Sequence, residues 1–249
     1  MILELQNVTK EYARRRLSLF QPCALLKAVN QVSFSISKGE SVGLIGESGS
    51  GKSTLAKLVM NIESPTSGRI LVNGKPIRKK QISDFELFKQ IQLVLQDSSS
   101  SLYPGMCVQE ILKEPLQNFF PEKKREYASA CIELLKLVGL DQSFLFRYPH
   151  ELSGGQKQRV CIAKALAVRP GLIIFDESIA SLDSSSQTAI ITMLKRIQKQ
   201  NQISFLFITH DLCSTQQLCD RVMVMYQGEI VETVKTGSGQ QPAHPYARL

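Results

Sequence analysis

Alternating hydrophobic and polar positions mark the N-terminal part of the chain as β structure. Residues 2–12, ILELQNVTKEY, and residues 29–37, VNQVSFSIS, alternate in this way, which is typical of half-buried strands in an antiparallel sheet. Residues 64–77, SPTSGRILVNGKPI, predict a turn, a strand, a second turn and a second strand. The alternation breaks over residues 13–27, which we interpret as a surface insertion whose function the sequence does not show.

Short, fully apolar runs between helical patterns indicate a second kind of sheet. Residues 41–46, 172–175 and 204–208 (SVGLIG, LIIF and SFLFI) have the length of strands, whereas residues 52–62, KSTLAKLVMNI, space their apolar side chains as one face of a helix does. Strands that are apolar on both faces and alternate with helices are typical of a buried, mostly parallel sheet. The pattern therefore predicts an α/β fold with an antiparallel N-terminal subdomain.

In the middle of the chain the hydrophobic pattern changes from that of strands to that of helices. Residues 108–120, VQEILKEPLQNFF, and residues 125–140, REYASACIELLKLVGL, both repeat apolar side chains at helical spacing. We interpret residues 97–160 as a helical subdomain inserted into one larger domain that spans residues 1–249. Residues 235–249 read as a short, loop-like C-terminal tail.

Composition narrows the class of protein. The chain has 249 residues, 43% hydrophobic and 21% charged, as in a soluble globular domain, and no apolar run approaches the ~18 residues of a membrane span. The N-terminus lacks the charged and apolar regions of a signal peptide, so we expect a cytoplasmic chain. The net charge of +8 comes from scattered basic runs, with neither an RNA-binding aromatic motif nor a zinc finger, so we expect no nucleic acid partner.

Residues 46–53, GESGSGKS, fit the phosphate-binding pattern G-x4-G-K-[ST]. The motif follows an apolar strand and opens a helix, so backbone N–H groups and the positive end of the helix dipole face a bound phosphate. We expect Lys52 to bridge the β- and γ-phosphates of a nucleotide and Ser53 to bind Mg²⁺. The predicted nucleotide loop consists of Gly46, Glu47, Ser48, Gly49, Ser50, Gly51, Lys52, Ser53 and Thr54.

Two carboxylates follow the apolar run at 172–175. Asp176 and Glu177 come where that strand ends, and ligands of open α/β sheets bind at the carboxyl ends of strands. In isolation such a pair is more often a helix cap. Beside a phosphate loop we expect Asp176 to hold Mg²⁺ and Glu177 to polarise the attacking water as a general base.

A second glycine motif, LSGGQ at residues 152–156, precedes these carboxylates and lacks a lysine. Taken alone, it also fits a serine-capped helix after a glycine turn. The order of phosphate loop, LSGGQ, carboxylates, SLD at 181–183 and THD at 209–211 closely resembles the ATP-binding-cassette (ABC) ATPase family over nearly the whole chain. The resemblance implies a P-loop fold with a RecA-like core and ATP with Mg²⁺ as ligands. It implies that ATP held by a partner cassette is contacted by Ser153, Gly154, Gly155 and Gln156.

Four further positions match this family's functional residues. The resemblance implies that Tyr12 stacks on adenine, although a tyrosine at a strand end is more often a packing residue. It implies that Gln96 senses the γ-phosphate and Mg²⁺, and that Asp183 couples the two nucleotide sites of a dimer. It also implies that His210 fixes the γ-phosphate and Glu177. The implied catalytic group is therefore Lys52, Gln96, Glu177 and His210.

Two stretches resemble one branch of the family, the peptide and nickel importer ATPases. These are QDSSSSLYP at residues 96–104 and HPYARL at residues 244–249. The sequence departs from that branch at Ser98 and Tyr103, where proline and asparagine are usual, and at Ser178–Ile179, where Pro-Thr is usual. The last change removes a fixed φ just after the expected base and puts its fine positioning in doubt.

The branch implies an ATPase subunit that pairs with a second, usually different, ATPase subunit beneath two membrane permeases. The resemblance places it at the cytoplasmic face of the membrane, with an extracytoplasmic binding protein delivering the cargo. Nickel or another transition metal, free or chelated, and short peptides remain open as cargo. Six cysteines without a CxxC pair predict reduced thiols, and the cysteine-bearing tail of longer relatives is absent, so we expect no iron–sulfur cluster.

Three alternative functions remain open at this point. An ATPase subunit of an exporter would share every motif. A soluble ABC ATPase of DNA repair or translation would usually carry long coiled coils, zinc sites or two cassettes in one chain. A nucleotide kinase would have no use for LSGGQ at 152–156 or for His210.

Overall fold

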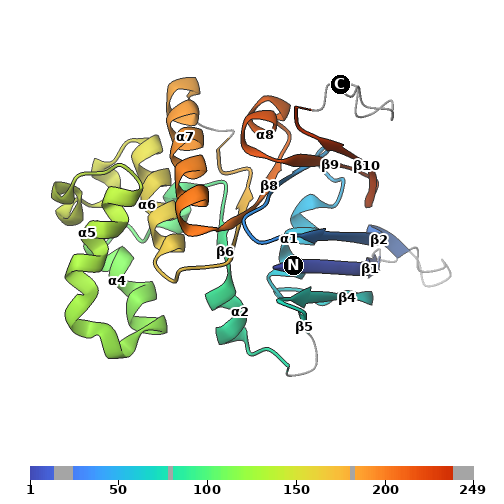
Figure 1. Cartoon of the computed structure of the whole chain (residues 1–249), viewed down its shortest axis with the longest axis horizontal. Helices are drawn as coiled ribbons and strands as arrows, with labels where there is room; N and C mark the ends of the chain where they lie inside the picture. Colours follow the sequence, from blue (N-terminus) through green and yellow to red (C-terminus); the bar gives the residue numbers. More distant parts are fainter. Residues whose placement is uncertain (14–24, 78–80, 180–182, 238–249) are drawn as a thin grey trace, which may run out of the picture. The chain divides into compact units, whose positions relative to one another are not determined.

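The structure, a computed structural model, describes residues 1–13, 25–77, 81–179 and 183–237 (Figure 1). Its main chain forms two compact units, one of Met1–Leu87 with Leu206–Leu249 and one of Phe88–Phe205. Helix α2 (Asp84–Gln90) and strand β8 (Ser204–Thr209) run through the boundaries between them. Most of the expected insertion at 13–27, and all of the HPYARL segment, lie outside the described residues.

An antiparallel sheet occupies the N-terminal part of the first unit. Its strands are β1 (Leu3–Ala13), β2 (Leu25–Ile36), β4 (Ser67–Val72) and β5 (Lys75–Pro76), in the order β2-β1-β4-β5. Leu3 pairs with Ile36 on one side and with Val72 on the other, and all three side chains are buried. Strand β2 begins at Leu25, so the prediction that residues up to 27 belong to an insertion is wrong at its end. The strand starts earlier because Leu25 and Leu26, although exposed, pair with β1.

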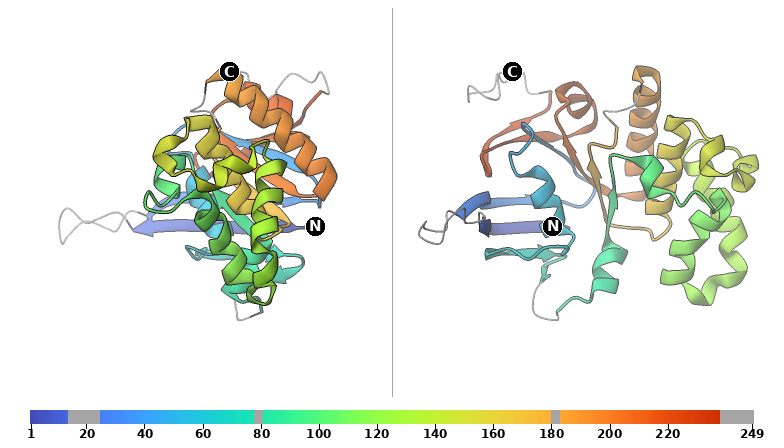
Figure 2. Two further views of the ribbon diagram at one scale, coloured as in Figure 1. Left: turned by 90° about the vertical axis from the view of Figure 1, so that its left-hand side faces the viewer. Right: turned by 180° about the vertical axis from the view of Figure 1, so that it is seen from behind.

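A mixed sheet completes the first unit. Strand β3 (Ser41–Ile45) pairs in parallel with β9 (Arg221–Tyr226), and β10 (Glu229–Lys235) pairs with β9 in antiparallel fashion. All five residues of β3 are buried, as its uninterrupted apolar run predicts. Helices α1 (Lys52–Val59) and α8 (Leu212–Leu218) belong to this unit, and α1 lies beside the antiparallel strands (Figures 1 and 2).

The second unit combines two parallel strands with helices. Strand β6 (Ile91–Val94) pairs with β7 (Leu172–Asp176), and Phe175 packs edge-on against Phe205 with ring centroids 5.4 Å apart. Between these strands the chain forms α3 (Ser98–Ser101), α4 (Val108–Phe119), η1 (Pro121–Glu126), α5 (Tyr127–Leu137), η2 (Gln142–Phe146), η3 (Pro149–Glu151) and α6 (Gly154–Leu166). Helix α7 (Ser184–Asn201) follows β7.

Apolar spacing explains the long helices of this unit. Helix α4 buries Ile111, Leu112 and Leu116 on one face, and Pro115 lies inside the same helix and is itself buried. Parallel pairing of β6 with β7, and of β3 with β9, confirms the predicted α/β class. None of the helices in the described part of the chain has the length and apolarity that crossing a bilayer requires.

Candidate functional site

The phosphate loop connects the buried strand β3 to helix α1. The N-cap residue of α1 is Gly51, which lies in the left-handed region at φ 111°, and no side chain caps the helix. The first N–H groups of an α-helix have no acceptor within the helix, so here they are available to an anion. Lys52 is only 5% exposed, and its ammonium donates to the carbonyls of Gly46 at 2.6 Å and Glu47 at 2.8 Å. The loop thus concentrates N–H donors and one cation.

Two glycines of this loop are required by close contacts. A Cβ on Gly46 would lie 2.3 Å from the Met225 carbonyl oxygen, and one on Gly51 would lie 2.1 Å from the Ala28 carbonyl oxygen. Real Cβ atoms essentially never approach backbone so closely, so any larger residue would move the loop. The glycine pattern therefore has a structural cause in addition to the phosphate chemistry.

Tyr12 lies near the end of β1 in the same unit and is half-buried. Its phenol donates a 2.5 Å hydrogen bond to Glu63 Oε2, and Lys10 Nζ lies 5.1 Å from the ring centroid. Burial raises the pKa of the Tyr12 phenol, and the hydrogen bond to Glu63 raises it further. Sequence reasoning missed Glu63, because nothing near Tyr12 in the chain points to it.

The carboxyl ends of β6 and β7 gather three of the predicted residues in the second unit. The parallel register pairs Val94 with Phe175, so the chain continues from both strands at the same edge, to Gln96 from β6 and to Asp176 and Glu177 from β7. Gln96 is exposed, and both carboxylates are half-buried. The structure therefore brings the predicted γ-phosphate sensor and the predicted base to one edge.

Glu177 has an unusual backbone. Its φ is 49°, in the left-handed region that non-glycine residues rarely occupy. Such strain persists where the surroundings enforce it and is common at functional sites. The next residue, Ser178, is 2% exposed, and its hydroxyl has no hydrogen-bond partner in the described part of the chain. Unlike the proline usual at this position, Ser178 has no ring that fixes its own φ.

The LSGGQ motif forms the N-terminus of α6. Ser153 is the N-cap residue and accepts from the Gln156 N–H at 3.4 Å, while Gln156 Oε1 accepts from the Ser153 N–H at 3.0 Å. This is a capping box, the structural alternative that the motif allowed when taken alone. The 3.4 Å hydrogen bond is long and therefore weak, so the Ser153 hydroxyl loses little hydrogen-bond energy if it turns to another partner. Ser153 and Gly154 are exposed, and Gly155 is half-buried.

Asp183 is the N-cap of α7 and lies close to this motif. Its carboxylate accepts from Ser185 Oγ at 2.6 Å and from the Ser186 N–H at 2.9 Å. These hydrogen bonds, that of Ser185 foremost, hold the pKa of Asp183 well below its usual range. Gly155 faces Ser186, so the structure joins the start of α6 to the cap of α7. Ser181 and Leu182, which precede Asp183, lie outside the described residues.

His210 directly follows β8, as its sequence context predicts, and its side chain is exposed.

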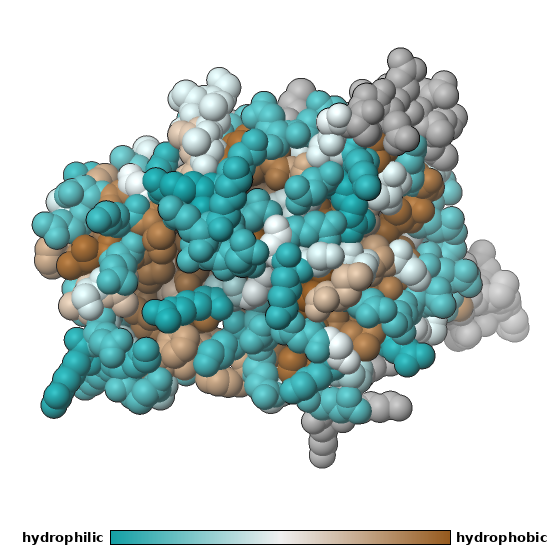
Figure 3. All heavy atoms as spheres, viewed as in Figure 1, coloured by the Kyte–Doolittle hydropathy of each residue, from teal (hydrophilic) through white to brown (hydrophobic). Residues whose placement is uncertain are grey.

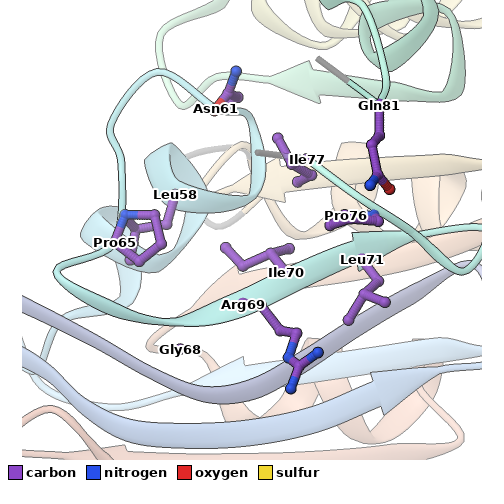
Figure 4. A pocket seen from close by; sticks show the side chains of 10 residues that line it. All are labelled: Leu58, Asn61, Pro65, Gly68, Arg69, Ile70, Leu71, Pro76, Ile77 and Gln81. Atoms are coloured by element: carbon purple, nitrogen blue, oxygen red, sulfur yellow. The ribbon is translucent and has the colours of Figure 1, made fainter. Parts of the chain in front are cut away.

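Three hollows in the described structure contain none of the predicted site residues. One of about 460 Å³ in the first unit is lined by Leu58, Pro65, Ile70 and Ile77, while Arg69 points away from it (Figure 4). In the second unit, a hollow of about 430 Å³ is bordered by α5, by the end of α6 and by Ile203; apolar surface, coloured brown, lies on the left of Figure 3, over the helices of this unit. The third, about 550 Å³, lies between β2 and β10.

The residues present fit a nucleotide with Mg²⁺. The uncapped N-terminus of α1 and the Lys52 ammonium suit phosphate oxygens. The hydroxyl of Ser53 and the carboxylate of Asp176 are hard oxygen donors, the ligand type that Mg²⁺ prefers. These two residues belong to different units of the structure.

Comparison with known proteins gives consistent matches. A family described as ABC transporter matches residues 29–180. The nickel import ATP-binding protein NikE of Escherichia coli (strain K12) is 47% identical over 210 residues, covering 84% of this chain and 78% of that protein. The oligopeptide transport ATP-binding protein AppF of Bacillus subtilis (strain 168) is 43% identical over 253 residues, covering 99% of this chain and 76% of that protein.

Solved structures share the fold. The ATP-binding cassette MJ0796, in a dimeric post-hydrolysis state bound to ADP and Pi, matches with a TM-score of 0.79 and 28% identity over 94% of this chain and 98% of that one. CbiO1 from Clostridium perfringens, part of the ABC transporter complex CbiONQ, matches with a TM-score of 0.80 and 29% identity. The match covers 94% of this chain and 88% of that one.

Proposed function

Because the chain belongs to the ABC transporter family, we propose that it is the ATP-binding and ATP-hydrolysing subunit of an importer for nickel or for short peptides. The observation that carries this proposal is the phosphate loop: α1 starts without a side-chain cap, behind two glycines that backbone contacts require, with Lys52 held in the loop. Relatives named for nickel import and for oligopeptide transport support the importer branch over an exporter. No finding favours a repair, translation or kinase role.

The loop and Tyr12 bind ATP in this proposal. First-turn N–H groups of α1 and the Lys52 ammonium hold the β- and γ-phosphates, and the Tyr12 ring stacks on the base. Moving to the phosphates takes Lys52 away from the Gly46 and Glu47 carbonyls that now accept from it. When bound, Mg²⁺ neutralises developing charge on the phosphate oxygens, and Ser53, Gln96 and Asp176 are the residues that would hold it.

Glu177 acts on the attacking water. The left-handed backbone of Glu177, directly after β7, fixes the direction in which its side chain leaves the main chain. A general base in this position contributes about 10²–10⁴-fold to the rate. Gln96 follows the neighbouring strand β6 at the same edge of the sheet. In this proposal it contacts the γ-phosphate and couples nucleotide binding to the helical part of the unit. His210 stabilises the γ-phosphate from the end of β8.

Two copies of such a cassette complete each nucleotide site. The LSGGQ serine sits at the exposed N-terminus of α6, where N–H groups and the helix dipole favour an anion. In the proposed dimer, Ser153, Gly154 and Gly155 of one subunit face the γ-phosphate on the other, and Asp183 lies beside them through Ser186. The dimeric state of the cassette MJ0796 supports this assembly.

A permease docks on the second unit. Exposed apolar side chains occur in the segment after β6: Leu95 is 46% exposed, Tyr103 67% and Met106 37%. Apolar patches on a surface can mark interaction sites, and Leu95 directly precedes Gln96, the proposed sensor of nucleotide. We propose that a helix of one of the two permeases binds near Gln96 and residues 97–110, so the subunit works at the cytoplasmic face of the membrane. The membership of CbiO1 in a transporter complex supports this assembly.

The cargo is selected outside this subunit. An extracytoplasmic binding protein and the permeases choose between nickel, a metal–chelator complex and a peptide in our proposal, and the second ATPase subunit is a different chain. Uptake assays in a strain that lacks this gene, with ⁶³Ni²⁺ and with a labelled dipeptide in parallel, distinguish the cargo classes.

A Glu177→Gln variant of the assembled transporter tests the ATPase function. We expect ATP to bind with about the wild-type dissociation constant while turnover falls by about 10²–10⁴-fold. Glu122→Gln, an exposed residue on η1, is the matched control and should keep full turnover. Near-normal turnover of Glu177→Gln would remove this residue from its role. Full-rate hydrolysis by an isolated monomer, unaffected by Ser153→Ala, would overturn the shared nucleotide site.

A further inference from the structure

The end of β1 that carries Tyr12 is fastened to the turn that follows α1. In this turn Thr66 N–H donates to the Thr9 carbonyl at 2.8 Å, and the Thr66 hydroxyl accepts from the Glu11 N–H at 3.0 Å. Lys10 Nζ donates to the Ser64 carbonyl at 3.0 Å. Three hydrogen bonds therefore hold the strand end to residues 64–66.

The same turn is fixed to the helix of the phosphate loop. The N–H groups of Ile62 and Glu63 both donate to the carbonyl of Lys57, in the last turn of α1, at 2.9 and 3.3 Å. Pro65 is buried and packs toward Leu58 of α1 at the wall of the hollow in Figure 4. The turn thus moves with α1, whose other end holds the phosphates in the proposed function.

Glu63 is where these two attachments meet. Its carboxylate accepts the 2.5 Å hydrogen bond from the Tyr12 phenol, lies 3.2 Å from Lys10 Nζ and lies 3.9 Å from Lys57 Nζ. Lys10 and Tyr12 come from β1, and Lys57 comes from α1. The hydrogen bond from Tyr12 lowers the pKa of Glu63, and Lys10 lowers it further, so the acceptor stays ionised at neutral pH.

We propose that Glu63 is a positioning residue that sets the Tyr12 ring at a fixed place relative to the phosphate loop, so that base and phosphates of a nucleotide are bound together. This inference rests on the proposed stacking of adenine on Tyr12. A ring held by its hydroxyl keeps one orientation, which removes a rotational entropy cost when the base stacks. Glu63 touches neither the phosphates nor the base and acts through Tyr12.

The test compares binding of ATP with binding of tripolyphosphate, which has no base, to the full chain by titration calorimetry. Tyr12→Ala should weaken ATP binding about tenfold, since stacking on an aromatic ring is worth about this much. Glu63→Ala and Tyr12→Phe, which each remove the hydrogen bond, should weaken it about threefold and should not add in the double variant. Tripolyphosphate affinity should change less than about twofold in every variant, because the loop itself is intact.

Two further variants separate positioning from a general structural effect. Glu63→Gln keeps an acceptor oxygen for the phenol and should recover most of the ATP affinity lost in Glu63→Ala. Glu229→Gln removes a carboxylate on β10 that accepts from Asn30, elsewhere in the same unit, and should bind both ligands as wild type does. In the assembled transporter, Glu63→Ala should raise KM for ATP and leave kcat unchanged.

Unchanged ATP affinity in Glu63→Ala and Tyr12→Phe, with a clear loss in Tyr12→Ala, would overturn the role of Glu63 and leave base stacking standing. Unchanged ATP affinity in Tyr12→Ala would overturn base stacking and the positioning role together. An equal loss of ATP and tripolyphosphate affinity in Glu63→Ala would show a collapse of the loop and would also overturn the positioning role.

Discussion

Gly155 of α6 and Ser186 of α7 face each other so closely that a Cβ on Gly155 would lie 3.0 Å from Ser186 Oγ and 3.3 Å from Ser186 Cβ. The two helices begin with the LSGGQ glycine pair and with the Asp183 cap respectively. The absence of a side chain at Gly155 therefore lets the two proposed trans-acting elements lie side by side, which gives the second glycine of the motif a packing role.

Gly155→Ala tests this contact. We expect a loss of about 1 kcal/mol in the free energy of unfolding, because about 2 kcal/mol of overpacking exceeds the ~1 kcal/mol gained in helix propensity. Urea titration measures it. Ser186→Ala in the Gly155→Ala background should recover about 0.5 kcal/mol or more through the coupling of touching residues. Strict additivity of the two changes would contradict the contact.

The Asp183 cap predicts a dependence of stability on pH. Because the pKa of Asp183 is lowered in the folded state, its contribution is complete above the unfolded-state pKa of about 3.9 and is lost as the pH falls through the lower folded-state pKa. The Tm of Asp183→Ala should lie a few degrees (~2–4 °C) below that of wild type at pH 6, and the gap should narrow as the pH falls below about 4. Thermal unfolding between pH 6 and pH 3 measures both curves.

Asp183→Asn provides the control for the cap. Asparagine still accepts from the Ser186 N–H but carries no charge, so its Tm should lie between those of wild type and Asp183→Ala. A gap between Asp183→Ala and wild type that stays constant down to pH 3 would show that the ionised carboxylate is not what stabilises α7.

Buried hydroxyls without partners predict stabilising substitutions. Ser178 Oγ and Ser41 Oγ are buried, and neither has a hydrogen-bond partner among the described residues. Replacing such a group with an apolar one removes a desolvation cost, so Ser178→Ala and Ser41→Ala should each raise the free energy of unfolding by about 1 kcal/mol. Denaturant titration checks this, and Thr9→Val, which removes the acceptor of the Gln31 N–H, should have the opposite sign. A loss of stability in Ser178→Ala would point to a partner for its hydroxyl.

Burial also ranks the thiols by reactivity. Burial raises the pKa of Cys131 to about 11 and that of Cys161 to about 12, whereas Cys107 is half-exposed at the start of α4. Since the thiolate is the reacting form, iodoacetamide at pH 8 should alkylate Cys107 at least about tenfold faster than either buried thiol. Peptide mapping by mass spectrometry after timed quenching measures the order. Early modification of Cys161 in folded protein would contradict its burial.

Local sequence was sufficient where one short segment carries both the structure and the chemistry. The apolar run before Gly46 predicts β3, the glycines predict the loop, and the spacing after Lys52 predicts α1. The run that ends at Asp176 predicts β7 for the same reason. Periodicity likewise located α4 and α5 to within a few residues, since their apolar faces repeat over several turns.

Interactions between distant segments could not be read this way. Glu63 shows no sign in the sequence that it binds Tyr12, because the bond depends on how the turn after α1 meets β1. The left-handed backbone of Glu177 could not be predicted either, since nothing about a glutamate favours a φ of 49°. The start of β2 at Leu25 was missed because pairing with β1, rather than alternation, holds that end of the strand.

The amino-acid sequence by itself determined the α/β class, the phosphate loop and the family, because each follows from short-range patterns of apolar residues, glycines and charges. Only the tertiary structure decided that Gly155 must be small to meet Ser186, and that Glu63 joins Tyr12 to the helix of the phosphate loop. Such contacts join residues far apart in the chain, and their geometry is set by packing of whole elements, which no local pattern encodes.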